Sequence, residues 1–355
     1  MSRIVDPRWP STFRAFRQQA GLSLRDLAAK AHYAKSYLHD LETGRKTPTA
    51  ELARRVTATD ISTTTIAGIE AAVDELATAY PTTASHVLLP RVRRHLTYVT
   101  TLVGSGRRMT LDQHRRILVA GGWLSLLTAT VLIDLHRRDA AAGHLRVADE
   151  MGAHTGHDEI RAWCLETRAW EVLTGGDPAA ALDLAHGAQT IAPTDSSAKL
   201  QATAQTGRAL ALLGDRQATG RRLAQLERIV SPLGQPDRPE HHYRYDPGKA
   251  RAYVATTLAW VGDPAAATEA SDVLAGLLTE GSRPRRIASA RLDLGQSVLP
   301  VDPHEAVAQV AAAVASGRVA ASNWWRVDRV RRGLARIGVP APELDELCET
   351  HQPLP

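Results

Sequence analysis

The sequence predicts an all-helical protein, in which a small N-terminal domain precedes an α-solenoid built from helical hairpins. Three observations lead to this fold class. Apolar residues recur at helical spacing in short segments of the first 56 residues. The remainder is rich in alanine and leucine and has no run of alternating apolar and polar residues. Finally, a turn centred on aspartate recurs at intervals of 38, 38, 48 and 39 residues, a period typical of stacked helical hairpins.

Positive charge is concentrated at the N-terminal end. The 355 residues carry a net charge of +5, but residues 1–56 hold 11 Lys and Arg against 5 Asp and Glu. The remainder holds 32 against 33. A basic module joined to a nearly neutral body is typical of a protein that contacts nucleic acid at one end. A basic face that is only solvated is the alternative that charge alone leaves open.

Two short amphipathic helices are expected between residues 12 and 31. In the first, Phe13 and Arg17 fall on one face, and a charge on this apolar stripe requires a partner. The second starts with Ser23 and Asp26 in the spacing of a capping box. Its apolar face is formed by Leu24, Leu27, Ala28 and Ala31.

A third helix is expected from Ala34 to Gly44, with Leu38 and Leu41 facing inward. Two short helices joined by about three residues form a helix-turn-helix, whose second helix can enter the major groove of DNA. The candidate base readers on the outer face and flanks of this helix are Lys35, Ser36, Tyr37, His39, Asp40 and Thr43. Arg45 and Lys46 follow the helix and suit phosphate contacts.

The stretch from Gly21 to Pro48, with its Leu41-Glu42-Thr43-Gly44 ending, resembles the Xre/Cro (lambda-repressor-like) DNA-binding family over about residues 9–56. The resemblance implies sequence-specific binding to double-stranded DNA. It also implies a structural ion pair between Arg17 and Glu42, and phosphate contacts by Ser23 and Arg25. One departure is His32, which stands where the family has a glycine in the turn. Because one head reads only a short half-site, we expect a homodimer on a pseudo-palindromic operator.

The domain organisation follows from composition. A helix-turn-helix domain at residues 1–58 is joined by a threonine-rich linker at 59–66 to a helical repeat domain at 67–355. In the repeat domain, Asp followed by Pro is typical of an N-cap followed by a first-turn proline, so each recurrence of this aspartate is interpreted as the turn inside a helical hairpin. The recurring aspartates are Asp139, Asp177, Asp215, Asp263 and Asp302.

This period resembles tetratricopeptide-like repeats, with the best match from Ala169 to Pro193. The resemblance implies a superhelix whose concave surface holds a small-molecule, peptide or protein effector. Regulators that join Xre-type heads to such repeats include peptide-pheromone sensors, which commonly grip the peptide with several asparagines. This chain has one asparagine, Asn323. The side chains expected to serve instead are Gln201, Gln205 and Arg208.

The longest repeat interval contains about ten extra residues, concentrated at 232–248. Insertions in repeat arrays map to loops, often on the binding face. Candidate ligand contacts there are His241, His242, Tyr243 and Tyr245. The alternative is a solvated connector. For Trp163, Trp170 and Trp260 we expect packing between hairpins rather than ligand contact.

No phosphate-binding loop, dinucleotide fingerprint, nucleophile elbow or metalloprotease helix is present, so we predict no enzyme, no catalytic residue, no cofactor and no metal site. The N-terminus lacks a secretory signal, and the uncharged stretch Ile117 to Ile133 is interpreted as a buried core helix rather than a membrane span. We therefore expect a cytoplasmic transcriptional regulator without a membrane partner. The alternative is a protein-interaction scaffold whose helix-turn-helix module serves dimerisation or partner contact.

Overall fold

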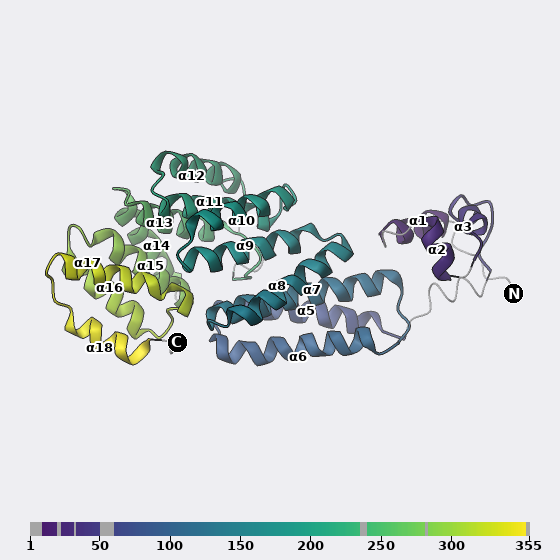
Figure 1. Cartoon of the computed structure of the whole chain (residues 1–355), viewed down its shortest axis with the longest axis horizontal. Helices are drawn as coiled ribbons and strands as arrows, with labels where there is room; N and C mark the ends of the chain where they lie inside the picture. Colours follow the sequence, from purple (N-terminus) through teal and green to yellow (C-terminus); the bar gives the residue numbers. More distant parts are fainter. Residues whose placement is uncertain are drawn as a thin grey trace.

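The computed structural model describes residues 9–19, 23–31, 33–49, 60–234, 240–280 and 283–352. Every regular element within these ranges is a helix, which confirms the predicted all-α fold class. Short helices lie at the N-terminal end, and a longer series of helices that pack side by side follows them (Figure 1).

The N-terminal domain consists of α1 (Trp9–Gln19), α2 (Leu24–Ala31) and α3 (Lys35–Glu42). Phe13, Leu38 and Leu41 are buried and form its small core. The predicted capping box is present, because the Asp26 backbone N–H donates to the Ser23 hydroxyl at 3.2 Å and the Ser23 backbone N–H donates to the Asp26 carboxylate at 3.2 Å. This core holds α3 by one side only and leaves the other side to solvent.

The rest of the chain forms consecutive helical hairpins, as expected of a solenoid. Within the hairpins α9 packs on α10, α11 on α12, α13 on α14 and α15 on α16, and the first helices of successive hairpins also pack on one another. The helices are α5 (Thr63–Ala79), α6 (Ser85–Gly104), α7 (Leu111–Asp134), α8 (Arg138–Thr155), α9 (Asp158–Thr174), α10 (Pro178–Ile191), α11 (Ser197–Leu212), α12 (Arg216–Val230), α13 (Pro247–Val261), α14 (Ala266–Glu280), α15 (Pro284–Val298), α16 (Pro303–Ala315), the 3-10 turn η1 (Ala321–Asn323), α17 (Trp324–Arg336) and α18 (Pro342–His351).

The recurring aspartates cap helices in most of the hairpins. The side chains of Asp177, Asp215 and Asp302 accept the backbone N–H three residues further on, at 3.0, 2.8 and 3.0 Å. Asp263 accepts instead from Ala265, two residues on. Asp139 departs from the prediction, because it lies inside the first turn of α8 and caps nothing.

The hairpin between α7 and α8 replaces the usual glycine with a histidine. Gly176 and Gly214 adopt left-handed conformations two residues before their helices begin, with φ of +95° and +79°. At the corresponding place His136 adopts φ +56°, and Arg137 rather than Asp139 occupies the capping position. A residue with a Cβ is strained in this conformation, so the same turn is made here at a cost in backbone energy.

The predicted linker overlaps a helix. α5 begins at Thr63, because the Ser62 hydroxyl accepts the Thr65 backbone N–H at 3.0 Å and Ile66 and Ile69 are buried. Threonine has a low helix propensity, so the composition of this stretch conceals a helix whose first turn is stabilised by a cap. Ile61 is also buried, so the part of this stretch from residue 60 onward packs on the body.

The uncharged stretch of α7 is a core helix, as predicted. By length and composition α7 is the one helix of the described residues that passes as a membrane-span candidate, and 83% of its apolar window is buried inside the protein. Gly121 and Gly122 permit this burial, since an added Cβ would lie 3.2 Å from Val99 and 3.1 Å from Ile160 respectively. Neighbouring helices therefore approach the α7 backbone closely.

Candidate DNA-binding helices and a central cavity

The outer face of α3 carries exposed polar side chains. Lys35, Ser36, His39 and Thr43 are exposed, and all lie away from the Leu38 and Leu41 core. The Thr43 hydroxyl donates to the His39 carbonyl at 2.9 Å and so belongs to the end of the helix. Lys35, Ser36 and His39 present a lysine, a hydroxyl and an imidazole to solvent, which are groups that can donate to or accept from base edges in a major groove.

Three further predicted DNA contacts are engaged within the domain. Tyr37 is half-buried and stacks on Tyr33 with ring centroids 5.6 Å apart. Asp40 forms an ion pair with Lys46, with Nζ 3.1 Å from Oδ2. The Asp40 carboxylate therefore has a counter-charge within the domain itself.

The remaining predicted contacts lie near the ends of α2 and α3. Arg25 and Arg45 are exposed. Ser23 is exposed as well, but its hydroxyl donates to the Asp26 carboxylate at 2.6 Å. The Ser23 hydroxyl therefore serves as a helix cap, and a DNA phosphate would have to share this hydroxyl with Asp26.

Arg17 and Glu42 form a bidentate ion pair across the domain. Arg17 Nε donates to Glu42 Oε1 at 2.6 Å and Nη2 donates to Oε2 at 3.0 Å, and Glu42 is buried. The hydrogen bond to Glu42 raises the pKa of Arg17. The pair fixes the end of α3 against α1. His32, expected in the turn between α2 and α3, lies outside the described residues.

Within the insertion at 232–248, the described segment from residue 240 onward folds back into the body. His241, Tyr243 and Tyr245 are buried, and the His242 backbone N–H donates to the Ala77 carbonyl of α5 at 3.1 Å. Tyr243 packs edge-on against Trp163, with ring centroids 5.2 Å apart. The described part of this insertion is therefore not a solvated connector, because its rings complete the core between α7 and α9.

The predicted ligand contacts separate into three groups. Gln201, Arg208 and His242 line a central cavity, whereas His241 and Tyr243 line a second hollow beside Trp123 and His157. Gln205 and Tyr245 line neither. Gln205 accepts from Arg208, and Tyr245 stacks on Tyr253 with centroids 5.9 Å apart.

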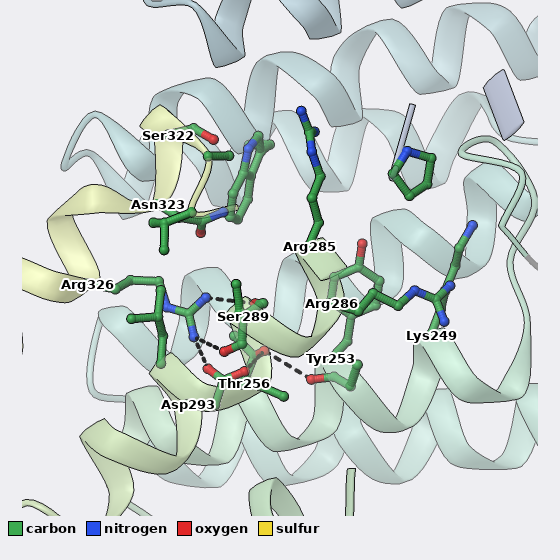
Figure 2. A pocket seen from close by; sticks show the side chains of 18 of the residues that line it. Lys249, Tyr253, Thr256, Arg285, Arg286, Ser289, Asp293, Ser322, Asn323 and Arg326 are labelled. Atoms are coloured by element: carbon green, nitrogen blue, oxygen red, sulfur yellow. Dashed lines mark hydrogen bonds and ion pairs between the residues drawn. The ribbon is translucent and has the colours of Figure 1, made fainter. Parts of the chain in front are cut away.

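The central cavity has a volume of about 240 Å³ and is partly open to solvent. Its walls come from α7, α9, α11, α13 and α15 and from the segment around η1, as Figure 2 shows in part. Contrary to the expectation of packing only, Trp170 and Trp260 also line it. The side chains that sequence reasoning missed include Asp134, Lys249, Tyr253, Arg285, Arg286, Asp293, Arg318 and Arg326. One local signal exists, since three arginines fall within residues 283–286.

Arg208 is held between two aromatic rings at the wall of the cavity. Its guanidinium carbon lies 4.2 Å from the Tyr253 ring centroid and 5.0 Å from that of Trp170. Glu166 lies 3.8 Å away, and burial raises the pKa of this carboxyl although Arg208 and Gln201 oppose the shift. The Arg208 guanidinium is thus stabilised by the two aromatic rings and by the buried carboxyl of Glu166.

A buried ion pair forms the opposite wall. Arg326 donates to Asp293 and, at 2.9 Å, to the Ser289 hydroxyl, and Thr256 donates to Asp293 at 2.7 Å (Figure 2). Burial raises the pKa of Asp293, although Arg326 favours its ionised form. This network ties α13, α15 and α17 together at the cavity.

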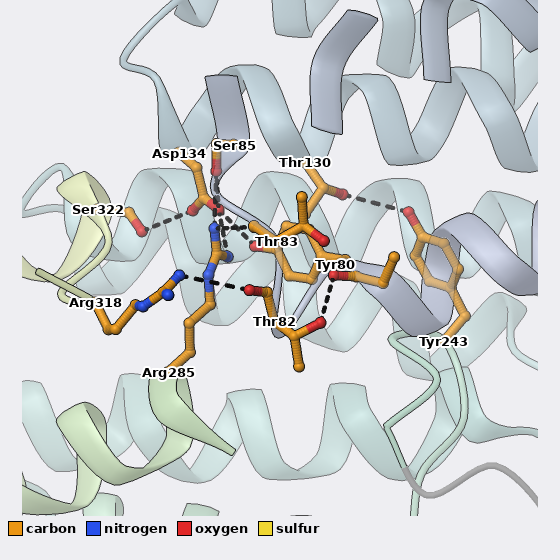
Figure 3. Close-up of polar contacts among 11 residues, drawn as sticks. Tyr80, Thr82, Thr83, Ser85, Thr130, Asp134, Tyr243, Arg285, Arg318 and Ser322 are labelled. Carbon is orange, nitrogen blue, oxygen red and sulfur yellow. Dashed lines mark hydrogen bonds and ion pairs between the residues drawn. The ribbon is translucent and has the colours of Figure 1, made fainter. Parts of the chain in front are cut away.

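The two ends of the repeat array meet at Asp134. Its carboxylate accepts from Tyr80 at 2.8 Å, Ser85 at 3.2 Å, Arg285 at 3.0 Å and Ser322 at 3.3 Å (Figure 3). Asp134 and these four donors, called the Asp134 cluster below, join the turn before α6 and the end of α7 to α15 and η1. The cluster closes one side of the cavity.

Comparison with known proteins identifies the N-terminal domain. A family described as "Helix-turn-helix domain" matches residues 11–62. A search of curated proteins found no match to the chain. The N-terminal domain is therefore a helix-turn-helix DNA-binding module, and it is joined to an α-solenoid with a central cavity. Among the described residues, no group of three His, Cys, Asp or Glu side chains is placed to hold a metal ion.

Proposed function

We propose that this protein is a cytoplasmic, sequence-specific transcriptional regulator of the Xre type. The observation that carries the proposal is the exposed polar face of α3 within a matched helix-turn-helix domain. Lys35, Ser36 and His39 contact base edges, with Tyr37, Asp40 and Thr43 beside them. The phosphate contacts are Arg45 and Lys46, which follow α3, and Ser23 and Arg25 at the start of α2.

The tetratricopeptide-like repeat domain holds the effector that modulates DNA binding. The central cavity supports this role, because it gathers side chains from helices that are far apart in sequence. A ligand changes DNA affinity only by the difference between its affinities for the competent and incompetent arrangements of the protein. Contacts between distant helices at the cavity, such as Arg285 with Asp134 at 3.0 Å, are where the two arrangements would differ.

The regulator acts as a homodimer. One head reads a short half-site, whereas two heads spaced by one helical turn of DNA, about 34 Å, match a pseudo-palindromic operator. Double-stranded DNA and a second copy of the chain are therefore its macromolecular partners.

Selection of bound sequences from a random pool of DNA duplexes, with the intact protein, tests this function. We expect an enriched inverted repeat, with affinity that falls steeply with salt. The variant with Ser36→Ala and His39→Ala is expected to lose the sequence preference. Gln18→Ala, an exposed change on α1, serves as the matched control. Failure to enrich any sequence, also in the presence of cell extract, would overturn the proposal and favour the protein-interaction scaffold.

A further inference from the structure

We propose that the central cavity binds a small organic acid, whose anionic headgroup contacts the basic side chains and whose apolar body contacts the rest of the lining. The inference rests on the proposed function, because it specifies the chemical class of effector held by the repeat domain. It follows from the charge, the hydrogen bonding and the size of the cavity.

The cavity has an excess of positive charge. Six basic side chains line it against the three carboxylates of Asp134, Glu166 and Asp293. The basic residues are Arg208, Lys249, Arg285, Arg286, Arg318 and Arg326. In the described part of the chain, the hydrogen bonds of the Lys249 ammonium and of the Arg318 guanidinium go to backbone carbonyls and not to carboxylates. The three Lys249 contacts use all three N–H donors of its ammonium group, so Lys249 contributes only its charge. The Arg318 guanidinium forms one such bond, to the Thr82 carbonyl, and its other donors can reach an anionic ligand.

Three helices begin at the cavity with basic residues in their first turns. Lys249 lies in the first turn of α13, Arg285 and Arg286 in that of α15, and Arg326 in that of α17, and none of these turns contains an acidic residue. Helix N-termini carry a partial positive charge and normally favour acidic side chains. Basic side chains at these positions lower the stability of the three helices, but they strengthen the attraction of the helix N-termini for an anion.

Lys249 shows the electrostatic effect of this arrangement. Burial and the neighbouring Arg286 lower the pKa of Lys249 to about 7. Asp246 and Glu240 oppose this shift in the pKa of Lys249, but both also face arginines, since Glu240 pairs with Arg283 at 2.7 Å and Asp246 lies 3.5 Å from Arg286. An anion in the cavity would favour the charged form of Lys249 through its charge.

Buried polar atoms at the cavity also lack partners. The indole Nε1 of Trp260 and the Nε of Arg326 form no hydrogen bond with any described residue, although the two side chains are only 3% and 2% exposed. Unsatisfied buried donors are costly, so a ligand that accepts from them gains affinity. The apolar part of the lining includes Pro81, Ala288, Leu292, Val319 and Ala320.

The size of the cavity limits the ligand. Sites for drug-sized molecules usually span about 300 to 1,000 Å³, and this cavity has a volume of about 240 Å³. Figure 2 shows Arg285 on one side of the space, Arg286 and Lys249 on a second, and Arg326 with Asp293 on a third. Charged groups on several sides suit a compact acid better than a peptide, which needs an extended groove.

Isothermal titration calorimetry with the full-length protein tests the inference. The probes are phenylacetate, phenyl phosphate, the neutral 2-phenylethanol and inorganic phosphate, which separate the carboxylate, the phosphate and the apolar body. We expect at least one aromatic acid to bind at about 1 mM or below and about tenfold more tightly than the alcohol and inorganic phosphate. Equal binding of acid and alcohol, or binding of neither acid, would overturn the proposal.

Two variants locate the binding. Arg318→Gln and Lys249→Met are expected to weaken the acid about tenfold and to leave the alcohol unchanged. Arg146→Gln, an exposed arginine of α8 outside the cavity, is the matched control. Arg318 is exposed, and among the described residues the hydrogen bond of its guanidinium goes to the Thr82 carbonyl at 3.5 Å, so its variant is expected to fold normally. Acid binding that is unchanged in both variants would place the ligand elsewhere and refute the inference.

This experiment is independent of the DNA-binding head. Failure of acid binding together with an enriched operator would refute the ligand class and leave the regulator intact. Acid binding without an operator would preserve the cavity assignment and overturn the proposed function.

Discussion

Arg285 of α15 donates to Asp134 of α7 at 3.0 Å, although 151 residues separate them in the chain. Both side chains are largely buried, at 18% and 5% exposure. A solenoid repeat normally contacts only its neighbours, so its two ends are held together only by a specific contact. Here the Asp134 cluster is such a contact, and Tyr80, Asp134, Arg285 and Ser322 of this cluster line one side of the partly open central cavity.

Replacing Asp134 should therefore destabilise the body strongly. Asp134→Asn leaves the Arg285 cation partly buried without its counter-charge, and removal of one partner of a buried pair costs about 3 to 5 kcal/mol. Urea unfolding followed by circular dichroism measures the loss. Asp345→Asn removes the partner of Arg331 in an exposed pair and is the control, with an expected change below about 1 kcal/mol. Equal effects of the two substitutions would contradict a closing role for the cluster.

Two substitutions, one on α3 and one just after it, should affect DNA binding differently. Arg45→Ala removes one exposed phosphate contact, so we expect weaker binding to all sequences and a salt dependence reduced by about one unit of slope. His39→Ala removes a base contact and should instead relax the preference at one position of the half-site. Fluorescence anisotropy with cognate and scrambled duplexes at several salt concentrations separates the two. A change of preference in Arg45→Ala would show that this arginine reads a base.

The lowered pKa of Lys249 predicts a dependence of stability on pH. The folded protein releases the proton at a pH of about 7, whereas an unfolded lysine retains it up to its ordinary value of 10.5. Between these values the unfolded state binds more protons, so stability should rise as the pH rises from 7 to 9. Lys249→Met should lack this contribution. Urea titration across this pH range measures the unfolding free energy of both proteins. As the pH rises, we expect the unfolding free energy of the wild type to increase relative to that of Lys249→Met. A constant difference would contradict the shifted pKa.

The turn between α7 and α8 should be improved by glycine. His136→Gly removes a side chain from a left-handed residue with φ +56°, and we expect a gain of up to about 1 kcal/mol. Gly214→His makes the reverse change at a turn where an added Cβ meets nothing within 4 Å, and should be destabilising. Thermal unfolding of both variants checks this prediction. A loss of stability in His136→Gly would indicate that the imidazole has a role of its own.

Several features follow from local patterns and were predictable. The spacing of Leu38 and Leu41 places Lys35, Ser36 and His39 on the opposite face, because a helix repeats every 3.6 residues. Caps such as Asp177, Asp215 and Asp302 are also local, since the side chain binds an amide three residues away. The all-helical class and the hairpin period follow from these patterns.

Other features depend on contacts between distant parts of the chain. No local sequence pattern predicts the inward position of Tyr37 or the pairing of Asp40 with Lys46. The same is true of the 241–245 segment, which packs against α7 and α9. Ser62 starts α5 inside a threonine-rich stretch because Ile66 and Ile69 are buried by other helices.

The sequence by itself determined the helices, their turns and the exposed face of α3, because periodicity and capping act over a few residues. Only the tertiary structure decided the cavity. Lys249, Arg285, Arg318 and Arg326 come from four separate segments, and Asp134 meets Arg285 across 151 residues. The curvature of the stacked hairpins brings these groups together, and that curvature is the sum of many packing contacts that no single sequence pattern records.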